Sequence, residues 1–269
     1  MTRRSHPVFG ALRAAAQSAP LVVAHRGASD SHPENTLAAF AAARSLGVPM
    51  QEFDVRATRD GILVCVHDET FDRTSDAASR LGPGALVAHL TFAEVSELDA
   101  GAWKGAEHAT QRVPTLASAI ACMTPDCVPL IEHKAGDPRS YIDGIAQCSA
   151  KQTCILQSFD WDFLAAAHRL APDLALAALG PNSKCSSPSE STLATLRELG
   201  VGMVHWQAEA LTRDDVTRVH AADMLVCTYT TDHELAWCGG ARLGFDAMCT
   251  NVPARMLKAR QLGSLRRDA

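Results

Sequence analysis

Short apolar runs alternate with helix-period segments along most of this chain, from Leu21 to about Leu257. Runs typical of strands lie at 21–25, 50–55, 62–67, 127–133, 153–158, 173–179, 201–206, 224–229 and 245–249. Ala-rich helical patterns lie between them, at 36–46, 115–123, 138–149, 160–170, 189–199, 212–222 and 233–242. Repeated strand–helix units predict a parallel sheet that is covered by helices.

The number of strand candidates is one more than a closed eight-stranded barrel needs. The link between 50–55 and 62–67 is too short for a crossover helix, and it carries the turn signal Asp60-Gly61. This pair therefore reads as a hairpin. Without 62–67, eight strands remain that belong to strand–helix units, which predicts an α/β fold of the TIM (β/α)8 type. The returning strand would bring His67 level with Glu52 and Asp54.

The length of 269 residues fits one barrel domain, with a core over about 20–257. Residues 69–113 break the rhythm and contain Gly82-Pro83-Gly84, so we expect a small insertion over the barrel rim, with a short helix near 91–98. We expect a short helix or an ordered lead-in over 1–19 and a frayed tail after Arg260. Asn35 and Asp160 are the expected N-caps of the helices that follow them.

Composition restricts the possible partners and locations. The net charge of -5 argues against general binding to nucleic acid or membrane surfaces. No window of about 20 residues is apolar enough to span a bilayer, and the N-terminus shows no signal peptide. The nine cysteines are scattered without CxxC spacing, so we expect buried, reduced thiols and a cytoplasmic location. No glycine-rich nucleotide-binding motif is present.

Three carboxylates stand on otherwise apolar strands. Residues two apart on a strand point the same way, so Glu52 and Asp54 share one face, and Glu132 and Lys134 share one face of a later strand. If those faces meet at a barrel mouth, Glu52, Asp54 and Glu132 converge. Oxygen ligands of this kind suit a hard divalent cation, Mg²⁺ or Ca²⁺.

Two histidines close apolar strands, where barrel enzymes place their chemistry. His25 and His67 form a pair suited to general acid and base work near neutral pH. Arg26 and Lys134 would hold phosphate oxygens, the arginine as a planar fork and the lysine as a point charge. His133 should face the helix layer instead.

These residues fall in a pattern that resembles the glycerophosphodiester phosphodiesterase family. The shared marks are His25-Arg26-Gly27, Pro33 to Thr36, Ala39-Phe40, Glu52 and Asp54, Thr58 to Asp68, Arg73-Thr74, Val113 to Leu116, Ile131 to Lys134, Gln157 to Phe159 and Phe245 to Thr250. The resemblance covers about residues 20 to 257. It implies metal-dependent release of an alcohol from a glycerophosphodiester, leaving sn-glycerol 3-phosphate, with His25 and His67 as acid and base.

The sequence departs from the family in two places. Cys227-Thr228-Tyr229-Thr230 stands where the family often carries W-T-V-N, so Tyr229 or Trp206 could supply the aromatic wall of the pocket. His133 replaces an aliphatic residue in the family's E-x-K. We expect residues 69–113 to shape the choice of alcohol and not to perform the chemistry.

Three other functions are compatible with parts of this pattern. The carboxylates could serve a metal-dependent isomerase or aldolase acting on a phosphosugar, although such chemistry does not need Arg26 beside His25. The chain could also be a non-catalytic phosphodiester-binding module, or a phosphodiesterase of the lysophospholipase D type. The sequence predicts a small-molecule substrate, and it does not predict the oligomeric state.

Overall fold

The computed structural model describes residues 6–266, and its strands form a closed parallel ring with one antiparallel extension. The strands are β1 (Leu21–His25), β2 (Met50–Ala57), β3 (Leu63–Cys65), β4 (Val128–His133), β5 (Ile155–Ser158), β6 (Ala175–Gly180), β7 (Val201–Gln207), β8 (Leu225–Tyr229) and β9 (Ala247–Thr250). They follow the order β1-β9-β8-β7-β6-β5-β4-β2-β3, and a further β1–β2 pairing closes the ring without β3. The expected TIM barrel is therefore confirmed.

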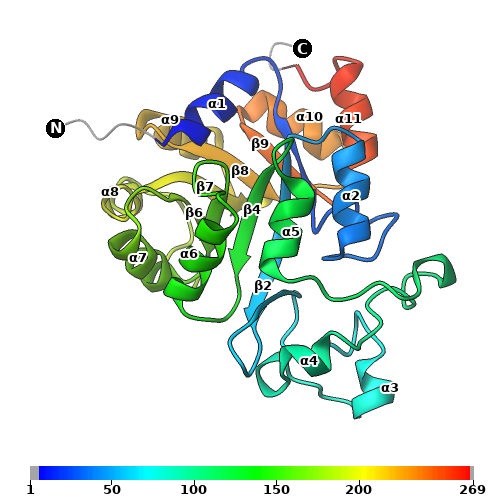
Figure 1. Cartoon of the computed structure of the whole chain (residues 1–269). Coiled ribbons are helices and arrows are strands. Elements are labelled where there is room, and N and C mark those ends of the chain that lie inside the picture. The colour runs from blue at the N-terminus through cyan, green and yellow to red at the C-terminus, as the bar shows by residue number, and fades with distance from the viewer. Residues whose placement is uncertain (1–5, 267–269) are drawn as a thin grey trace.

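Helices pack around the outside of this ring (Figure 1). Those around the ring are α2 (Leu37–Ser45), α5 (Leu116–Met123), α6 (Pro138–Gln147), α7 (Trp161–Leu170), α8 (Glu190–Glu198), α9 (Arg213–Ala221), α10 (Glu234–Leu243) and α11 (Pro253–Gln261). Helix α1 (Pro7–Ala15) lies at one end of the ring, and α3 (Ala77–Leu81) and α4 (Phe92–Val95) lie within residues 69–113. Each barrel strand alternates between two apolar clusters. In β1, Val22 packs between sheet and helices, while Leu21 and Val23 fill the barrel interior.

Helix α1 closes the amino-terminal end of the barrel. Its buried residues Val8, Phe9 and Leu12 belong to the same cluster as the inward residues of the strands. The Phe9 ring lies so close to β7 that a Cβ atom on Gly202 would come within 2.3 Å of it. Because this end is plugged, the open end of the barrel is the one where the strands finish, and substrates reach the inward side chains there.

The predicted hairpin is present, with β3 antiparallel to β2 and Val55 opposite Cys65. Residues 69–113 follow it and form a lobe that carries α3 and α4 beyond the end of β2 (Figure 1). The lobe has a small core of its own, built from Val64, Val66, Phe71, Ala77, Val87, Val95, Leu98, Ala100 and Val113. The lobe is therefore packed against the hairpin that bears His67.

Two expectations about chain ends and caps need correction. Thr36, and not Asn35, caps α2, since Asn35 takes a positive φ of 57° and turns its amide to Asp54. The chain after Arg260 does not fray at once, because α11 runs to Gln261 and Leu265 is fully buried. Asp160 caps α7 as expected. Residues 1–5 and 267–269 lie outside the described part, and so does that part of the expected lead-in and tail.

The nine cysteines are all free thiols, and five of them are buried. This agrees with the reduced thiols expected from their spacing, while the cytoplasmic location stays a prediction. Within residues 6–266, none of the helices has the length and apolar character needed to cross a bilayer.

The turn after β1 depends on Gly27, which has a φ of +83°. A Cβ atom there would lie 2.7 Å from the backbone of Ala39 at the start of α2. Gly47 has a similar φ of +75°, but a Cβ atom there would meet nothing within 4 Å. Left-handed backbone costs about 1–2 kcal/mol for a residue with a Cβ atom.

We therefore predict that Gly27→Ala lowers the free energy of unfolding by about 3 kcal/mol or more, because strain and a backbone clash add. Gly47→Ala should cost only about 1 kcal/mol. Urea unfolding of both variants measures the difference. Equal losses would mean that the close approach to α2 contributes nothing.

Candidate active site

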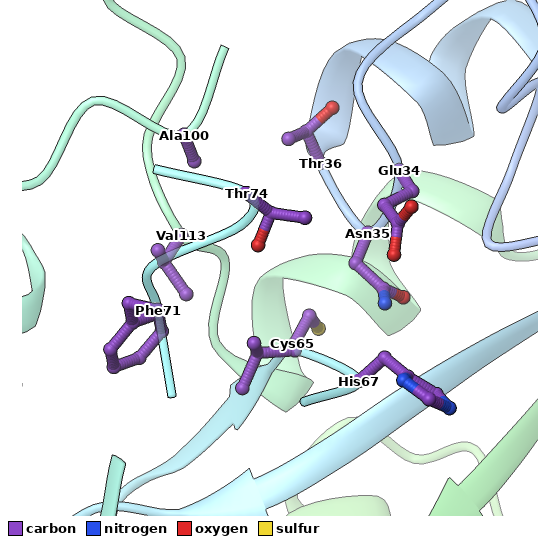
Figure 2. Close-up of a pocket in the computed structure, with 10 residues that line it drawn as sticks. Glu34, Asn35, Thr36, Cys65, His67, Phe71, Thr74, Ala100 and Val113 are labelled. Carbon is purple, nitrogen blue, oxygen red and sulfur yellow. The ribbon is translucent and has the colours of Figure 1, made fainter. Parts of the chain in front are cut away.

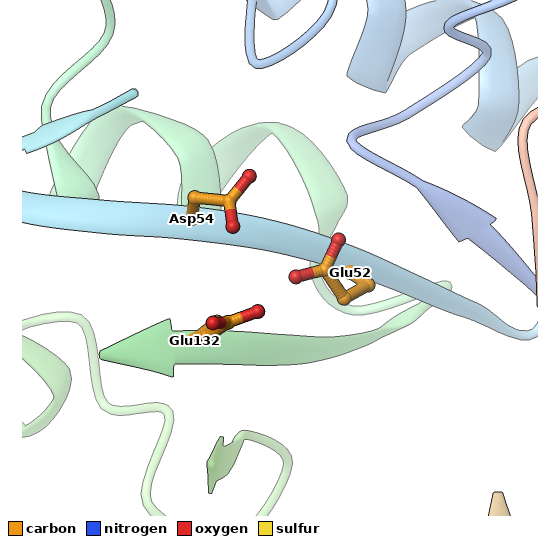
Figure 3. Close-up of side chains that lie close together, drawn as sticks. All are labelled: Glu52, Asp54 and Glu132. Carbon is orange, nitrogen blue, oxygen red and sulfur yellow. The ribbon is translucent and has the colours of Figure 1, made fainter. Parts of the chain in front are cut away.

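Three carboxylates meet where β2 and β4 run side by side at the open end of the barrel (Figure 3). Glu52 and Asp54 come from β2 and Glu132 from β4, with Asp54 directly opposite Glu132 in the pairing. One oxygen from each lies within 4.8 Å of the others, and the residues are 2%, 1% and 7% exposed. The same-face spacing therefore brings all three together, as the sequence predicted.

The three carboxyl groups differ in their surroundings. Burial tends to raise the pKa of Asp54, but Arg26 and Lys134 outweigh it and hold that pKa at about 2. Burial and the charge of Asp54 raise the pKa of Glu132 to about 7. Burial, Asp54 and Glu132 together raise the pKa of Glu52 well above its usual range. Neither oxygen of Glu52 has a hydrogen-bond partner, so this group lacks the counter-charge that a buried carboxylate needs.

Arg26 and Lys134 supply the positive charge of the cluster. The Nε atom of Arg26 lies 3.0 Å from Asp54, and Lys134 Nζ lies 3.3 Å from Asp54 and 2.5 Å from Glu132. Burial opposes both positive charges, but the neighbouring carboxylates, Asp54 first among them, together outweigh it and raise the pKa of Arg26 and of Lys134. Both side chains thus stay charged at the pocket wall.

The turn between β1 and α2 aims Arg26 at this cluster. Arg26 has a φ of 56°, and its backbone N–H donates to the carbonyl of Glu52 at 2.8 Å, which extends the β1–β2 pairing. Asn35 closes the turn, since its amide donates to Asp54 at 3.0 Å and accepts from the Asp54 backbone at 3.2 Å. The backbone of this turn therefore holds the side chains of Arg26 and Asn35 against β2.

The two histidines face the same pocket and are oriented in different ways. His25 Nδ1 lies 2.7 Å from the side-chain oxygen of Asn251, and its Nε2 lies 3.8 Å from Glu52. His67 Nδ1 lies 2.6 Å from Asp68, and its carbonyl accepts from Arg56 at 3.0 Å. Burial and the charge of Arg26 lower the pKa of His25.

A pocket of about 190 Å³ opens above the carboxylates. One side is lined by His25, Arg26, Glu52, His67, Glu132 and Lys134, and the other by Phe159, Leu179, His205, Tyr229 and Thr230. Tyr229 therefore supplies an aromatic wall, while Trp206 is buried between β7 and the helices. Among the described residues that line the pocket, none comes from 69–113, which is not what we expected of a segment that shapes the alcohol site.

Sequence reasoning gave no role to His205, although this residue falls within the predicted strand 201–206. His205 lies on β7, faces inward beside Met203, and its Nδ1 is 2.7 Å from the side-chain oxygen of Gln157. Burial lowers the pKa of His205 to about 3, so the ring is neutral. Inward and outward alternation along 201–206 was the signal that could have found it. His133 faces outward as expected and stacks on Phe163 at 3.6 Å between ring centroids.

Sequence reasoning also assigned no role to the residues that hold the histidines. Asn251, which orients His25, donates to Asp232 at 2.7 Å. Glu34 and Thr74 lie with His67 at the seam between barrel and lobe (Figure 2). These contacts join segments far apart in the chain, so no local pattern shows them.

The fold and the site are those of a barrel enzyme that acts on a phosphate ester. The model of the glycerophosphoryl diester phosphodiesterase family matches residues 25–255. A glycerophosphodiester phosphodiesterase of Bacillus subtilis is 28% identical over 252 residues, which cover 87% of this chain and 84% of that protein. One from Caldanaerobacter subterraneus is 37% identical over 166 residues, covering 59% of this chain and 66% of that protein.

Among solved structures, an Oleispira antarctica phosphodiesterase in complex with the product sn-glycerol-3-phosphate is similar, with a TM-score of 0.80 and 27% identity. The alignment covers 90% of this chain and 97% of that one. Because the family model spans most of the sequence, the chain belongs to the glycerophosphoryl diester phosphodiesterase family, and it is an enzyme of that class.

From the raised pKa of Glu132 we predict how the free energy of unfolding depends on pH when EDTA keeps the enzyme free of metal. An unfolded Glu titrates near its ordinary value of 4.5, whereas folded Glu132 titrates at about 7. Between these values the folded state binds the extra proton, so this group stabilises the fold at low pH and loses that contribution as the pH rises through the window.

The Glu132→Gln variant stays uncharged. Its free energy of unfolding should therefore rise relative to that of the wild type by about 1–3 kcal/mol as the pH goes from 5 to 8. Urea unfolding at several pH values measures this, with Glu198→Gln on the exposed face of α8 as the control. A difference that stays constant across the pH range would contradict the raised pKa.

Proposed function

We propose that this enzyme hydrolyses glycerophosphodiesters to sn-glycerol 3-phosphate and an alcohol, using a divalent cation and a His25/His67 acid–base pair. The observation that carries the proposal is the convergence of Glu52, Asp54 and Glu132 beneath a pocket lined by both histidines. The product bound by the Oleispira antarctica relative supports the same substrate class.

The donor set fits a hard cation. All three groups offer carboxylate oxygens, and both oxygens of Glu52 lack a hydrogen-bond partner although they are buried. Such oxygens suit Mg²⁺ or Ca²⁺, which accept oxygen ligands in preference to nitrogen or sulfur. When bound, the cation supplies positive charge that stabilises the developing charge on the phosphoryl oxygens.

Arg26 and Lys134 bind the phosphate from the same side of the pocket. Each already contacts Asp54, so their cationic groups stand in fixed positions and need little rearrangement when the substrate binds. Preorganised positive charge stabilises a transition state more than a mobile side chain does. The arginine contributes a planar donor set, and the lysine a point charge.

The different hydrogen-bond partners of the two histidines support different roles for them. The partner of His67 is the carboxylate of Asp68, which can accept from the Nδ1–H of an imidazolium, whereas the partner of His25 is the neutral amide of Asn251. We therefore assign proton removal from the attacking oxygen to His25 Nε2. His67 then donates a proton to the departing alcohol oxygen through its own Nε2.

The alcohol would lie against Phe159, Leu179 and Tyr229, across the pocket from the carboxylates. Phe159 also borders a second hollow of about 470 Å³ that includes Trp161 and Asn182. This neighbouring hollow keeps a lysophospholipase D-type activity as the second candidate, because a longer substrate would need that room. Assays with glycerophosphocholine, glycerophosphoethanolamine and a lysophospholipid distinguish the two.

Activity should depend on a divalent cation held by Glu52. We predict that dialysis against EDTA abolishes turnover, that Mg²⁺ or Ca²⁺ restores it, and that Glu52→Gln needs at least about tenfold more cation, since the variant loses a charged ligand. Thermal unfolding with and without cation provides the second readout. Wild-type activity that survives in excess EDTA would contradict metal dependence.

The role of His67 predicts a dependence on the leaving group. His67→Gln should lower turnover of glycerophosphocholine about 10²–10⁴-fold, the usual contribution of a positioned general acid. The p-nitrophenyl diester of glycerol 3-phosphate should lose far less, because p-nitrophenolate leaves without a proton. His25→Gln should slow both substrates alike. If both variants showed the same leaving-group dependence, the assignment of acid and base would be wrong.

A further inference from the structure

Arg73, at the start of the rim lobe, contacts two carboxylates of the barrel side with one guanidinium. Its Nε donates to Asp68 at 2.6 Å, while Nη1 and Nη2 donate to the two oxygens of Glu34 at 2.9 and 2.8 Å. Each of the three guanidinium nitrogens therefore donates to a carboxylate. Lysine, with a single point of positive charge, cannot form the two parallel hydrogen bonds to Glu34 while it also donates to Asp68.

Both carboxylates have a second contact, and in each case it is a residue of the reaction site. The other oxygen of Asp68 lies 2.6 Å from His67 Nδ1. The Oε1 atom of Glu34 also accepts from Arg26 Nη1 at 2.7 Å. Arg73 is thus linked to the proposed general acid, His67, through Asp68, and to the phosphate-binding Arg26 through Glu34.

The charges of this bridge are stable across the working pH range. The hydrogen bond from Arg73 is the largest cause that lowers the pKa of Asp68 to about 2. Burial works against the charge of Glu34, but Arg73 and Arg26 outweigh it and lower its pKa. The side chain of Arg73 is 46% exposed, so its ion pairs contribute little to the stability of the fold. Their main effect is to fix the positions of Asp68 and Glu34.

The lobe fixes where Arg73 stands. Phe71 is buried in the core of the lobe, and its backbone N–H donates to Ala85 at 3.1 Å. Asp72 accepts from the backbone of Gly84 at 2.6 Å and of Ala85 at 3.1 Å. In Figure 2, Phe71 and Thr74 face the seam that also holds Glu34 and His67. The position of the arginine therefore depends on the folded lobe.

We propose that Arg73 is a positioning residue: through Asp68 it sets the tautomer and ring orientation of His67, and through Glu34 it holds Arg26 against the pocket. This rests on the proposed acid role of His67 and adds a task to the lobe, which lines none of the pocket among the described residues. Residues 69–113 contribute to the chemistry by fixing groups that touch the substrate.

The activity test compares glycerophosphocholine with the p-nitrophenyl diester in the metal-loaded enzyme. Asp68→Asn should lower turnover of the choline ester about 10- to 100-fold more than that of the p-nitrophenyl ester, because only the first needs the proton from His67. Glu34→Gln should slow both esters equally, because it acts on phosphate binding. Arg73→Ala should show both effects, and Arg73→Lys a smaller version of them.

The double variant and a matched arginine make the test specific. Arg73→Ala combined with Asp68→Asn should change the ratio of the two rates no more than Asp68→Asn alone, since both act through one group. Arg80→Ala removes another exposed arginine of the lobe, which contacts Glu97 and Asp76 but no site residue, and should leave the ratio within about twofold. A ratio that changes equally in Arg73→Ala and Arg80→Ala would reduce Arg73 to a structural role.

Nitrogen NMR of the histidine rings tests the same claim without any reaction. The signals of His67 are identified by their loss in His67→Gln, and the neutral ring of the wild type should carry its proton on Nδ1, so that the proton given to the alcohol is the one added at Nε2. Arg73→Ala should shift them toward a tautomer mixture, and Arg80→Ala should leave them unchanged. Unchanged His67 signals in Arg73→Ala would overturn the proposal. If His67→Gln were fully active while these signals shifted, the acid role would fail and the positioning would stand.

Discussion

The contacts of Arg26 and Lys134 with Asp54 allow three carboxylates to share one buried volume at the barrel mouth. Isolated buried charges are costly, and like charges close together add to that cost. The two cations neutralise Asp54, but they leave both oxygens of Glu52 without a hydrogen bond. The remaining imbalance is the physical reason to expect a divalent cation, since binding it converts an unfavourable arrangement into a useful one.

The barrel makes this arrangement possible because side chains along each strand point alternately inward and outward. Inward residues near the amino-terminal end are apolar, as Met50 and Leu130 show, and the same faces turn acidic at Glu52 and Glu132. Helix α1 seals the apolar end, and the pocket above the carboxylates opens at the polar end. The lobe then completes the site from outside by holding Arg73 beside Asp68 and Glu34.

The sequence predicted the parts of this site that depend on spacing. Alternation placed Glu52 and Asp54 on one face, and the short Asp60-Gly61 link predicted the hairpin that returns His67. Seven predicted side chains lie together, because strand ends of a parallel barrel meet at one mouth: His25, Arg26, Glu52, Asp54, His67, Glu132 and Lys134. The family and the fold class are confirmed, while the roles of the individual residues stay proposals.

The parts that the sequence did not predict depend on contacts between distant segments. Asn251 reaches His25 across 226 positions, and Arg73 reaches Glu34 across 39. Asparagine is a common N-cap residue, but the positive φ of Asn35 turns its side chain to Asp54 instead. In such cases tertiary hydrogen bonds outweigh local preference, and only the folded chain shows which partner is used.

Anomalous diffraction from crystals grown with Mn²⁺ in place of Mg²⁺ tests the central claim most directly. The account predicts a single strong peak in the pocket, within about 2.0–2.6 Å of oxygens from Glu52, Asp54 and Glu132. The peak should be absent in Glu52→Gln crystals grown at the same Mn²⁺ concentration. A wild-type enzyme that is active with Mn²⁺, yet shows no peak at these carboxylates, would contradict the account.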